Sequence, residues 1–352
     1  AVLMRLGARR WIALVAAGWG VVACLTAFVR TPTELYAARF LLGAVEAGFV
    51  PAIVLYLSWW FPTRLRTQVV AVYGLSVPVA GIIGGPIAGW ILTAFAGADG
   101  WRILMICEGI PSVAAGIWLF LSLPDQPSSA SWLTSAEADK ISRSSTLSRG
   151  RPAAVTLAQV LRTLRVPTVW RLCLAYFLMV GGTFGITLWL PQFLRLPGWE
   201  SPAVIGWIST IPWLFGALAI LVVSRFTDRR RSYAVVAAVG ALCSAGALVA
   251  ACAADNRWAA LALITLAVGA MLASTTAFWG LPPEILAGEH AAVGVPTVNA
   301  AGFAGALVSP VAIGWLVSTP AKMAGGIAFC AMLLAACALT LCGWRRHFHV
   351  AA

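Results

Sequence analysis

The chain has 352 residues, of which 61% are hydrophobic and 10% are charged, and its formal net charge is +12. So few charged residues cannot cover the surface of a water-soluble globule of this size, which excludes a soluble enzyme or binding domain. The positive charge does not indicate nucleic-acid binding, because the arginines lie between apolar segments and not on one solvated face. The composition therefore predicts an all-α polytopic membrane protein.

Apolar segments of about 20 residues, the length that crosses the hydrocarbon core as a helix, recur along the chain. They predict ten membrane-spanning helices, at residues 11–29, 36–60, 68–95, 102–122, 168–193, 203–223, 233–253, 258–279, 293–317 and 324–343. Most of the 24 Lys and Arg residues fall in the loops on one side. The positive-inside rule makes that side cytoplasmic. We therefore expect a multi-pass protein of the plasma (inner) membrane with both termini in the cytoplasm.

One polar stretch divides these helices into two groups. Residues 124–166, rich in serine and basic side chains, are interpreted as a cytoplasmic linker. It separates an N-terminal bundle of four helices, residues 1–123, from a C-terminal bundle of six helices with a short basic tail, residues 167–352. A basic segment also recurs before a helix in each half, from Met4 to Trp11 and from Ser224 to Tyr233, as an internal repeat requires. If the halves are equivalent, the first two of twelve helices are missing.

Arg39 and Glu46 are the only charged residues between Ala37 and Trp60, a segment long enough to cross a bilayer. An ionisable group at membrane depth costs about 2.5 kcal/mol or more on insertion scales, so it commonly faces a cavity or a partner and carries function. Nearly two helical turns separate the pair, which puts both groups on one face roughly 10 Å apart along the axis. Alternatively, they pair with each other or with neighbouring helices and hold the bundle together. Glu108, also near membrane depth, is expected to be structural.

Two groups of glycines interrupt the apolar segments. Gly81, Gly85 and Gly89 repeat every fourth residue, so one face of their helix is bare backbone that a neighbouring helix can approach. This face is expected to be a packing and rocking surface. Gly181 and Gly182 lie within another predicted helix, where they indicate either a gating bend or close helix packing.

Several stretches of the sequence resemble the major facilitator superfamily and, within it, the anion:cation symporters that carry organic acids such as sugar acids, tartrate, aromatic acids and allantoate. They are Arg39-Phe-Leu-Leu-Gly43-Ala-Val-Glu46-Ala-Gly48-Phe-Val-Pro51, Leu57-Ser-Trp-Trp-Phe-Pro62, Gly100-Trp-Arg102-Ile-Leu-Met-Ile-Cys-Glu108-Gly-Ile-Pro111, Leu123-Pro-Asp125, Phe278-Trp279-Gly-Leu-Pro282-Pro-Glu284 and Val298-Asn299-Ala-Ala-Gly302. The resemblance implies the twelve-helix fold of two bundles, with this chain aligning from the loop between the second and third helices. The Asp-Arg pair that this family usually carries on the first helix is then absent from the sequence.

The resemblance also implies roles for individual residues. The position of Glu46 is that of the proton-coupling carboxylate, and Arg39 modulates it or handles the anion. Trp279 and Asn299 match positions that line the central cavity, where an amide and an indole N–H can bind hydroxyls or a carboxylate. Alternatively, Trp279 lies in an interfacial aromatic belt, and Asn299 makes a hydrogen bond between helices.

A further resemblance concerns the cytoplasmic loop after the predicted helix at 203–223. Asp228, Arg229 and Arg230 resemble the superfamily's loop motif, whose charges hold neighbouring helices together in the outward-facing state.

The expected function is secondary active transport: import of a small organic anion with protons by alternating access. The partners are the anion, protons and the bilayer, the protein is expected to be a monomer, and no metal or cofactor is expected. The sequence contains no GxxxxGK[ST] motif, which argues against an ATP-driven pump. It also contains no HExxH motif, which argues against a membrane-embedded hydrolase. The eight cysteines, without ligand spacing, are interpreted as packing residues. The alternatives are a non-transporting receptor or scaffold, and a sodium-coupled or exchange transporter.

Overall fold

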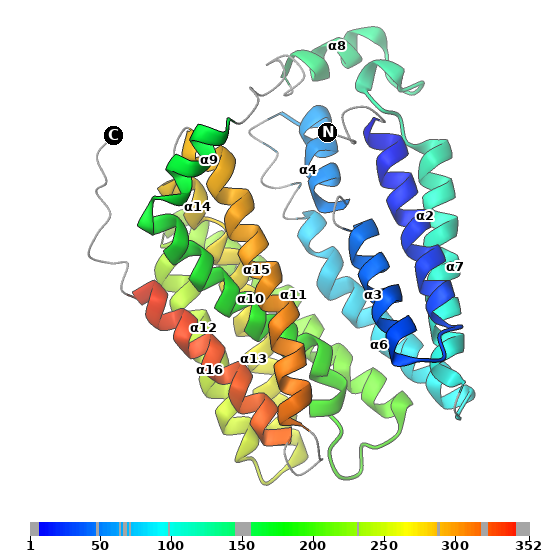
Figure 1. Cartoon of the computed structure of the whole chain (residues 1–352), viewed down its shortest axis with the longest axis vertical. Helices are drawn as coiled ribbons and strands as arrows, with labels where there is room; N and C mark the ends of the chain where they lie inside the picture. Colours follow the sequence, from blue (N-terminus) through cyan, green and yellow to red (C-terminus); the bar gives the residue numbers. More distant parts are fainter. Residues whose placement is uncertain are drawn as a thin grey trace. The chain divides into compact units, whose positions relative to one another are not determined.

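A computed structural model of the chain describes residues 7–46, 49–62, 65, 69, 72–97, 99–144, 156–230, 232–286, 289–317 and 323–342. Throughout these ranges the regular structure is helical (Figure 1). The helices are α2 (Ala8–Thr26), α3 (Pro32–Glu46), α4 (Phe49–Trp60), α6 (Ser76–Ala94), α7 (Gly100–Ser122), the 3₁₀ turn η1 (Pro127–Ser129), α8 (Ser135–Ser144), α9 (Leu157–Leu164), α10 (Pro167–Phe193), α11 (Pro202–Arg230), α12 (Tyr233–Cys252), α13 (Arg257–Phe278), α14 (Leu281–Ile285), α15 (Glu289–Leu316) and α16 (Met323–Cys342).

Among the described residues, nine helices are long and apolar enough to cross a membrane. They coincide with nine of the ten predicted spans. The remaining span, 36–60, is described as α3 and α4, of 15 and 12 residues, and residues 47 and 48 between them lie outside the described part. The prediction of an all-α polytopic membrane fold is confirmed.

The helices group into two compact units. The first unit contains residues 1–76 and 90–153, and the second contains residues 77–89 and 154–352. The middle of α6 therefore groups with the helices of the second unit, whereas the sequence places it in an N-terminal bundle of residues 1–123. The predicted limits of the bundles and linker stay predictions.

In the first unit, α2 lies along α7 because small residues line their contact. A Cβ atom at Gly109 would lie 2.6 Å from the Gly20 carbonyl oxygen, and one at Gly116 would lie 2.5 Å from the Ala17 nitrogen. Only glycine at these positions lets the two backbones come so close. The Ser112 hydroxyl donates a hydrogen bond across the same contact to the Ala16 carbonyl, at 2.9 Å.

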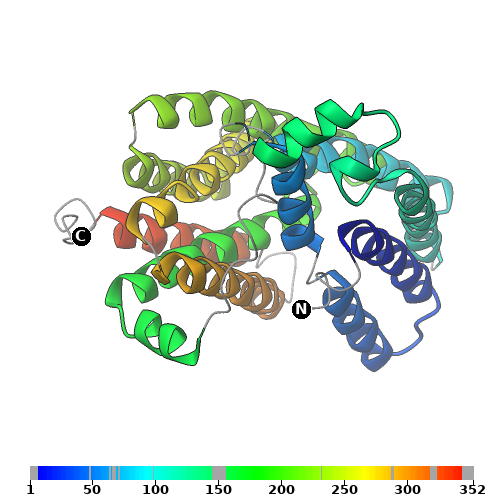
Figure 2. The ribbon, with the colours of Figure 1, turned by 90° about the horizontal axis from the view of Figure 1, so that it is seen from above.

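In the second unit, α10 packs against α15 and α16, and α12 packs against α13. Figures 1 and 2 both show α15 running beside α10. Two buried serines join α12 to α13: Ser244 donates to the Ala267 carbonyl at 2.8 Å, and Ser274 donates to the Ala237 carbonyl at 2.6 Å. Such bonds satisfy hydroxyls that would otherwise be unpaired in an apolar interior.

Two short helices, α8 and α9, lie in the polar stretch between the apolar segments. Thr134 and Glu137 cap α8, since the Glu137 carboxylate accepts from the Thr134 N–H at 3.0 Å and from its hydroxyl at 2.8 Å. These bonds lower the pKa of Glu137 below its ordinary value, because they stabilise the charged form. Thr156 and Gln159 form a capping box at the start of α9. Local capping therefore sets where both helices begin.

Candidate functional site

Helix α3 carries the predicted charge pair, and its first turn is capped by its own side chains. The Glu34 carboxylate accepts hydrogen bonds from the Arg30 N–H at 2.7 Å and the Thr31 N–H at 3.4 Å, while the Glu34 N–H donates to the Thr31 hydroxyl at 3.2 Å. No residue of α3 is buried. Arg39 and Glu46 are therefore both exposed on this helix.

Two further titratable residues of the first unit lie within electrostatic range of this pair. The charge of Glu46 acts on the Tyr73 phenol, which precedes α6, and the charge of Arg39 acts on Glu108 of α7. Within the described part of the chain, Arg39 forms no salt bridge with either carboxylate. Among the described residues, Arg39 and Glu46 thus do not form a direct ion pair with each other, and the alternative of a structural role through neighbouring helices stays a prediction. No spacing in the sequence links Tyr73 to Glu46 or Glu108 to Arg39, so neither neighbour was predicted.

In the second unit, Trp279 contacts a buried tyrosine. The Trp279 indole N–H donates to the Tyr176 hydroxyl at 3.2 Å, and the two rings meet edge to face with centroids 5.0 Å apart. The Tyr176 ring also stacks on Phe278, at 4.9 Å. The Trp279 indole N–H, predicted to be available to a substrate, is therefore already hydrogen-bonded in this structure. A tyrosine within an apolar segment was the signal that could have identified Tyr176.

Asn299 lies on α15 and is partly exposed. Gly302, one turn further along the same helix, packs against the Tyr176 ring. Residues from α10, α15 and the end of α13 thus meet around Tyr176, close to the two predicted binding residues of this unit. The Asn299 amide makes no hydrogen bond to another described residue.

The Tyr176–Trp279 hydrogen bond is expected to stabilise the folded protein. Replacing Tyr176 with Phe removes the acceptor and keeps the ring, so we expect the free energy of unfolding to fall by about 0.5–1.5 kcal/mol. The same change made in a Trp279→Phe background should have almost no effect, because the bond is already absent. Thermal unfolding of the four proteins in detergent measures both values. Equal losses in the two backgrounds would contradict the bond.

The predicted glycines lie at close helix contacts within the second unit. Gly85 and Gly89 of α6 approach α11: a Cβ atom at Gly85 would lie 2.8 Å from the Gly206 carbonyl oxygen, and one at Gly89 would lie 3.1 Å from the Gly206 Cα. Gly81 faces the Trp213 ring, which also belongs to α11. A hydroxyl of α11, that of Thr210, adds a hydrogen bond to a carbonyl of α6 at 3.3 Å. Gly81, Gly85 and Gly89 therefore form a packing surface against α11. Their role in a rocking motion stays a prediction.

On α10, a Cβ atom at Gly181 would lie 3.3 Å from Leu333 Cδ1, and one at Gly182 would lie 2.7 Å from Leu334 Cγ. Both atoms belong to α16, so these two glycines also lie at a helix contact, and their gating role likewise stays a prediction. Asp228, Arg229 and Arg230 are the last residues of α11, but their side chains lie outside the described part.

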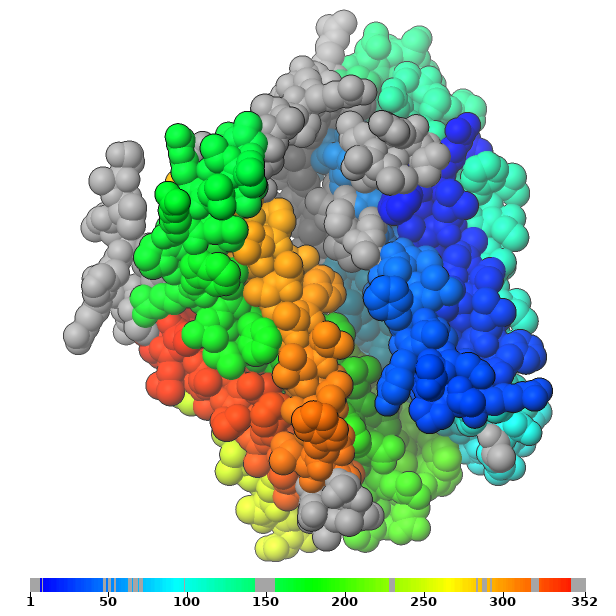
Figure 3. Space-filling model, viewed as in Figure 1, coloured from blue at the N-terminus to red at the C-terminus, as the bar shows by residue number. Residues whose placement is uncertain are grey.

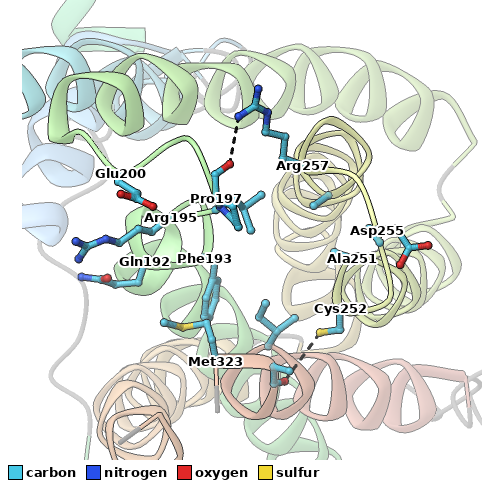
Figure 4. A pocket seen from close by; sticks show the side chains of 15 residues that line it. Gln192, Phe193, Arg195, Pro197, Glu200, Ala251, Cys252, Asp255, Arg257 and Met323 are labelled. Carbon is cyan, nitrogen blue, oxygen red and sulfur yellow. Dashed lines mark hydrogen bonds between the residues drawn. The ribbon is translucent and has the colours of Figure 1, made fainter. Parts of the chain in front are cut away.

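A cavity of about 830 Å³ lies within the second unit, where α10 and α12 end and α13 and α16 begin (Figure 4). Gln192, Arg195 and Glu200 lie on one side of it and Asp255 lies on the opposite side. The Arg257 guanidinium donates to the Pro197 carbonyl at 3.2 Å. None of the predicted site residues lines this cavity. Among the described residues, no group of three or more His, Cys, Asp or Glu side chains could hold a metal ion.

Apolar helices of membrane-spanning length, with charged groups among them, define a polytopic membrane protein. The sequence matches the Major Facilitator Superfamily over residues 1–310, and the chain belongs to this family of transporters. It is 36% identical over 345 residues to a putative tartrate transporter of Agrobacterium vitis, covering 96% of this chain and 78% of that protein. It is 31% identical over 340 residues to a quinolone resistance transporter of Acinetobacter baumannii, covering 94% of this chain and 77% of that protein.

The fold is also that of a solved transporter. The xylose transporter XylE of E. coli, in a partially occluded inward-open conformation, superposes with a TM-score of 0.70 at 16% identity, over 99% of this chain and 83% of that chain. At this identity the likeness concerns the fold alone. It confirms the predicted major facilitator fold.

Proposed function

We propose that this transporter imports a small organic anion, a carboxylate such as a sugar acid, tartrate or an aromatic acid, together with protons. The observation that carries the proposal is the pair Arg39 and Glu46, which are exposed on one helix in an otherwise uncharged segment. A guanidinium binds a carboxylate, and a carboxyl group at membrane depth can load and release a proton. The 36% identity to a putative tartrate transporter supports the same class of substrate.

Co-transport of a proton removes the electrical free energy that opposes entry of the anion. A negative cell interior opposes anion entry by about 2.3 kcal/mol per elementary charge and 100 mV. One proton that travels with a monovalent anion cancels this term, so both cross electroneutrally. In this proposal Arg39 holds the anion and Glu46 carries the proton. Tyr73 and Glu108 adjust the field around them, because each lies within electrostatic range of one member of the pair.

We also propose that the protein belongs to the anion:cation symporters. It lies in the plasma (inner) membrane as a monomer, with both termini in the cytoplasm. Alternating access then exposes the site first to the outside and then to the cytoplasm. The basic loops after the spans support this orientation.

The experiment records the external pH of lightly buffered, de-energised cells that express the protein. Sugar acids, tartrates, aromatic acids and neutral sugars are added in turn. We expect one class of acid to make the medium alkaline, because protons enter with it, and neutral sugars to have no effect. Uptake that requires sodium without a change in pH would replace the proton with sodium. Silence across the panel, in a protein shown to reach the membrane, would overturn the proposal in favour of exchange or a receptor role.

A further inference from the structure

Helix α9 is fixed to the second unit by one of its faces. Thr163 is fully buried, and its hydroxyl lies 3.0 Å from Nδ1 of His290 on α15. At the end of the helix, the Trp170 indole N–H of α10 donates to the Leu164 carbonyl at 2.7 Å. These two contacts set the rotation of α9 about its axis, so its remaining faces have a defined direction relative to α10 and α15.

A second face of α9 is apolar and exposed. Leu157 is 73% exposed and Leu161 is 49% exposed, and residues four apart lie on the same side of a helix. The exposed apolar surface continues onto α10, where Trp170 is 56% exposed and Leu174 is also exposed. α10 is long and apolar enough to cross a membrane, and exposed apolar side chains on such a helix suit contact with lipid. Tryptophan at the end of such a helix is typical of the membrane–water interface.

A third face of α9 is basic. Arg162 and Arg165 are exposed, and a rotation of about 100° per residue puts Arg165 beside Leu161 and Arg162 between Arg165 and the Thr163 face. Within the described part of the chain, neither guanidinium forms a salt bridge. An apolar face bordered by unpaired arginines is the pattern of a helix that lies in the plane of an anionic membrane surface.

We propose that α9 lies in the membrane–water interface and binds the phosphate groups of acidic phospholipids through Arg162 and Arg165. Leu157 and Leu161 enter the boundary between headgroups and acyl chains, beside Trp170. A lipid is the occupant that fits because the leucine face continues the exposed apolar surface of α10 and because phosphates complement the two arginines. The site is separate from the substrate pair on α3, so it does not depend on the proposed function.

The first test maps what touches the leucine face. The photo-reactive residue benzoylphenylalanine replaces Leu161 in the full chain, which is reconstituted in vesicles with equal amounts of phosphatidylcholine and phosphatidylglycerol. The matched control places it at Ala136, an exposed position of α8. We expect lipid adducts at position 161 and not at position 136, detected by mass spectrometry. Adducts of position 161 with another segment of the protein would show that the chain itself covers this face, and would overturn the proposal.

The second test concerns the charge of the lipid. Each basic residue near an anionic surface strengthens binding roughly fivefold, so two together give on the order of twentyfivefold. We therefore expect adducts at position 161 to favour phosphatidylglycerol, and the double variant R162Q/R165Q to lose that preference while it keeps adducts with phosphatidylcholine. Arg195→Gln, which changes an exposed arginine beyond the other end of α10, is the control and should keep the preference. An unchanged preference in the double variant would exclude the two arginines as the phosphate ligands.

Discussion

Replacing Glu46 with Gln should abolish proton-driven accumulation of the substrate while exchange of substrate across the membrane continues. Gln has nearly the shape of Glu but cannot carry a proton, so binding and alternating access survive and only the coupling is lost. The coupled proton cancels the barrier of about 2.3 kcal/mol per 100 mV to anion entry, which corresponds to a roughly fiftyfold difference in the internal-to-external ratio of the anion between coupled and uncoupled transport. We therefore expect accumulation to fall to the equilibrium level. Uptake and counterflow of a labelled acid in membrane vesicles measure the two processes separately.

Glu34 provides the matched control for this experiment. It lies on the same helix and is also exposed, but its carboxylate is used in the first turn, where it accepts from the Arg30 and Thr31 N–H groups. Glu34→Gln should keep proton-driven accumulation, since an amide oxygen can still accept these bonds. If the Glu46 variant accumulates substrate as the unchanged protein does, Glu46 is not the coupling group. If it loses exchange as well, its role is in binding or folding.

Replacing Gly85 with Ala should lower the free energy of unfolding by about 1–3 kcal/mol, the usual cost of overpacking a close contact. The new methyl group would lie 2.8 Å from the Gly206 carbonyl oxygen of α11, and a backbone atom cannot rotate away as a side chain can. The two helices must therefore separate. Thermal unfolding of the purified protein in detergent measures the loss.

Gly84, the preceding residue of the same helix, separates this contact from the general effect of a glycine substitution. A Cβ atom there would have no atom within 4 Å among the contacts of the described structure. Gly84→Ala should therefore change stability by no more than about 0.5 kcal/mol, as surface substitutions usually do. Equal losses in the two variants would show that the contact with α11 does not decide the result, because alanine is the better helix former and propensity alone would stabilise both variants.

The sequence predicts most of the helices because length and hydropathy are local properties. Nine predicted spans match helices of the structure, since a membrane requires about 20 apolar residues in a row wherever a chain crosses it. The span 36–60 shows the limit of that signal at its start: α3 begins at Pro32, in a polar first turn that hydropathy does not mark.

The candidate site is predictable only in part, for a related reason. Helical periodicity places Arg39 and Glu46 on one face, because both belong to one helix. The neighbours of these groups come from other parts of the chain: Tyr73 near Glu46, and Glu108 near Arg39. Likewise, no sequence spacing joins Tyr176 to Trp279, whose hydrogen bond forms only when α10 packs against the end of α13. Such contacts depend on tertiary packing, which periodicity does not contain.

One of the cysteines has a use that follows from where it lies. Cys252 is exposed at the end of α12 and lines the cavity of the second unit, with Sγ 4.0 Å from the Ala324 carbonyl oxygen (Figure 4). In contrast, Cys173, Cys330 and Cys337 are buried among the helices. Figure 3 shows one face of the chain, with α15 (orange) and α16 (red) at its surface. Once the other exposed cysteines, Cys107, Cys243 and Cys342, are replaced, a water-soluble thiol reagent can therefore attach a spectroscopic label at this native residue. The hydration of this cavity could then be followed during turnover without a new cysteine in the chain.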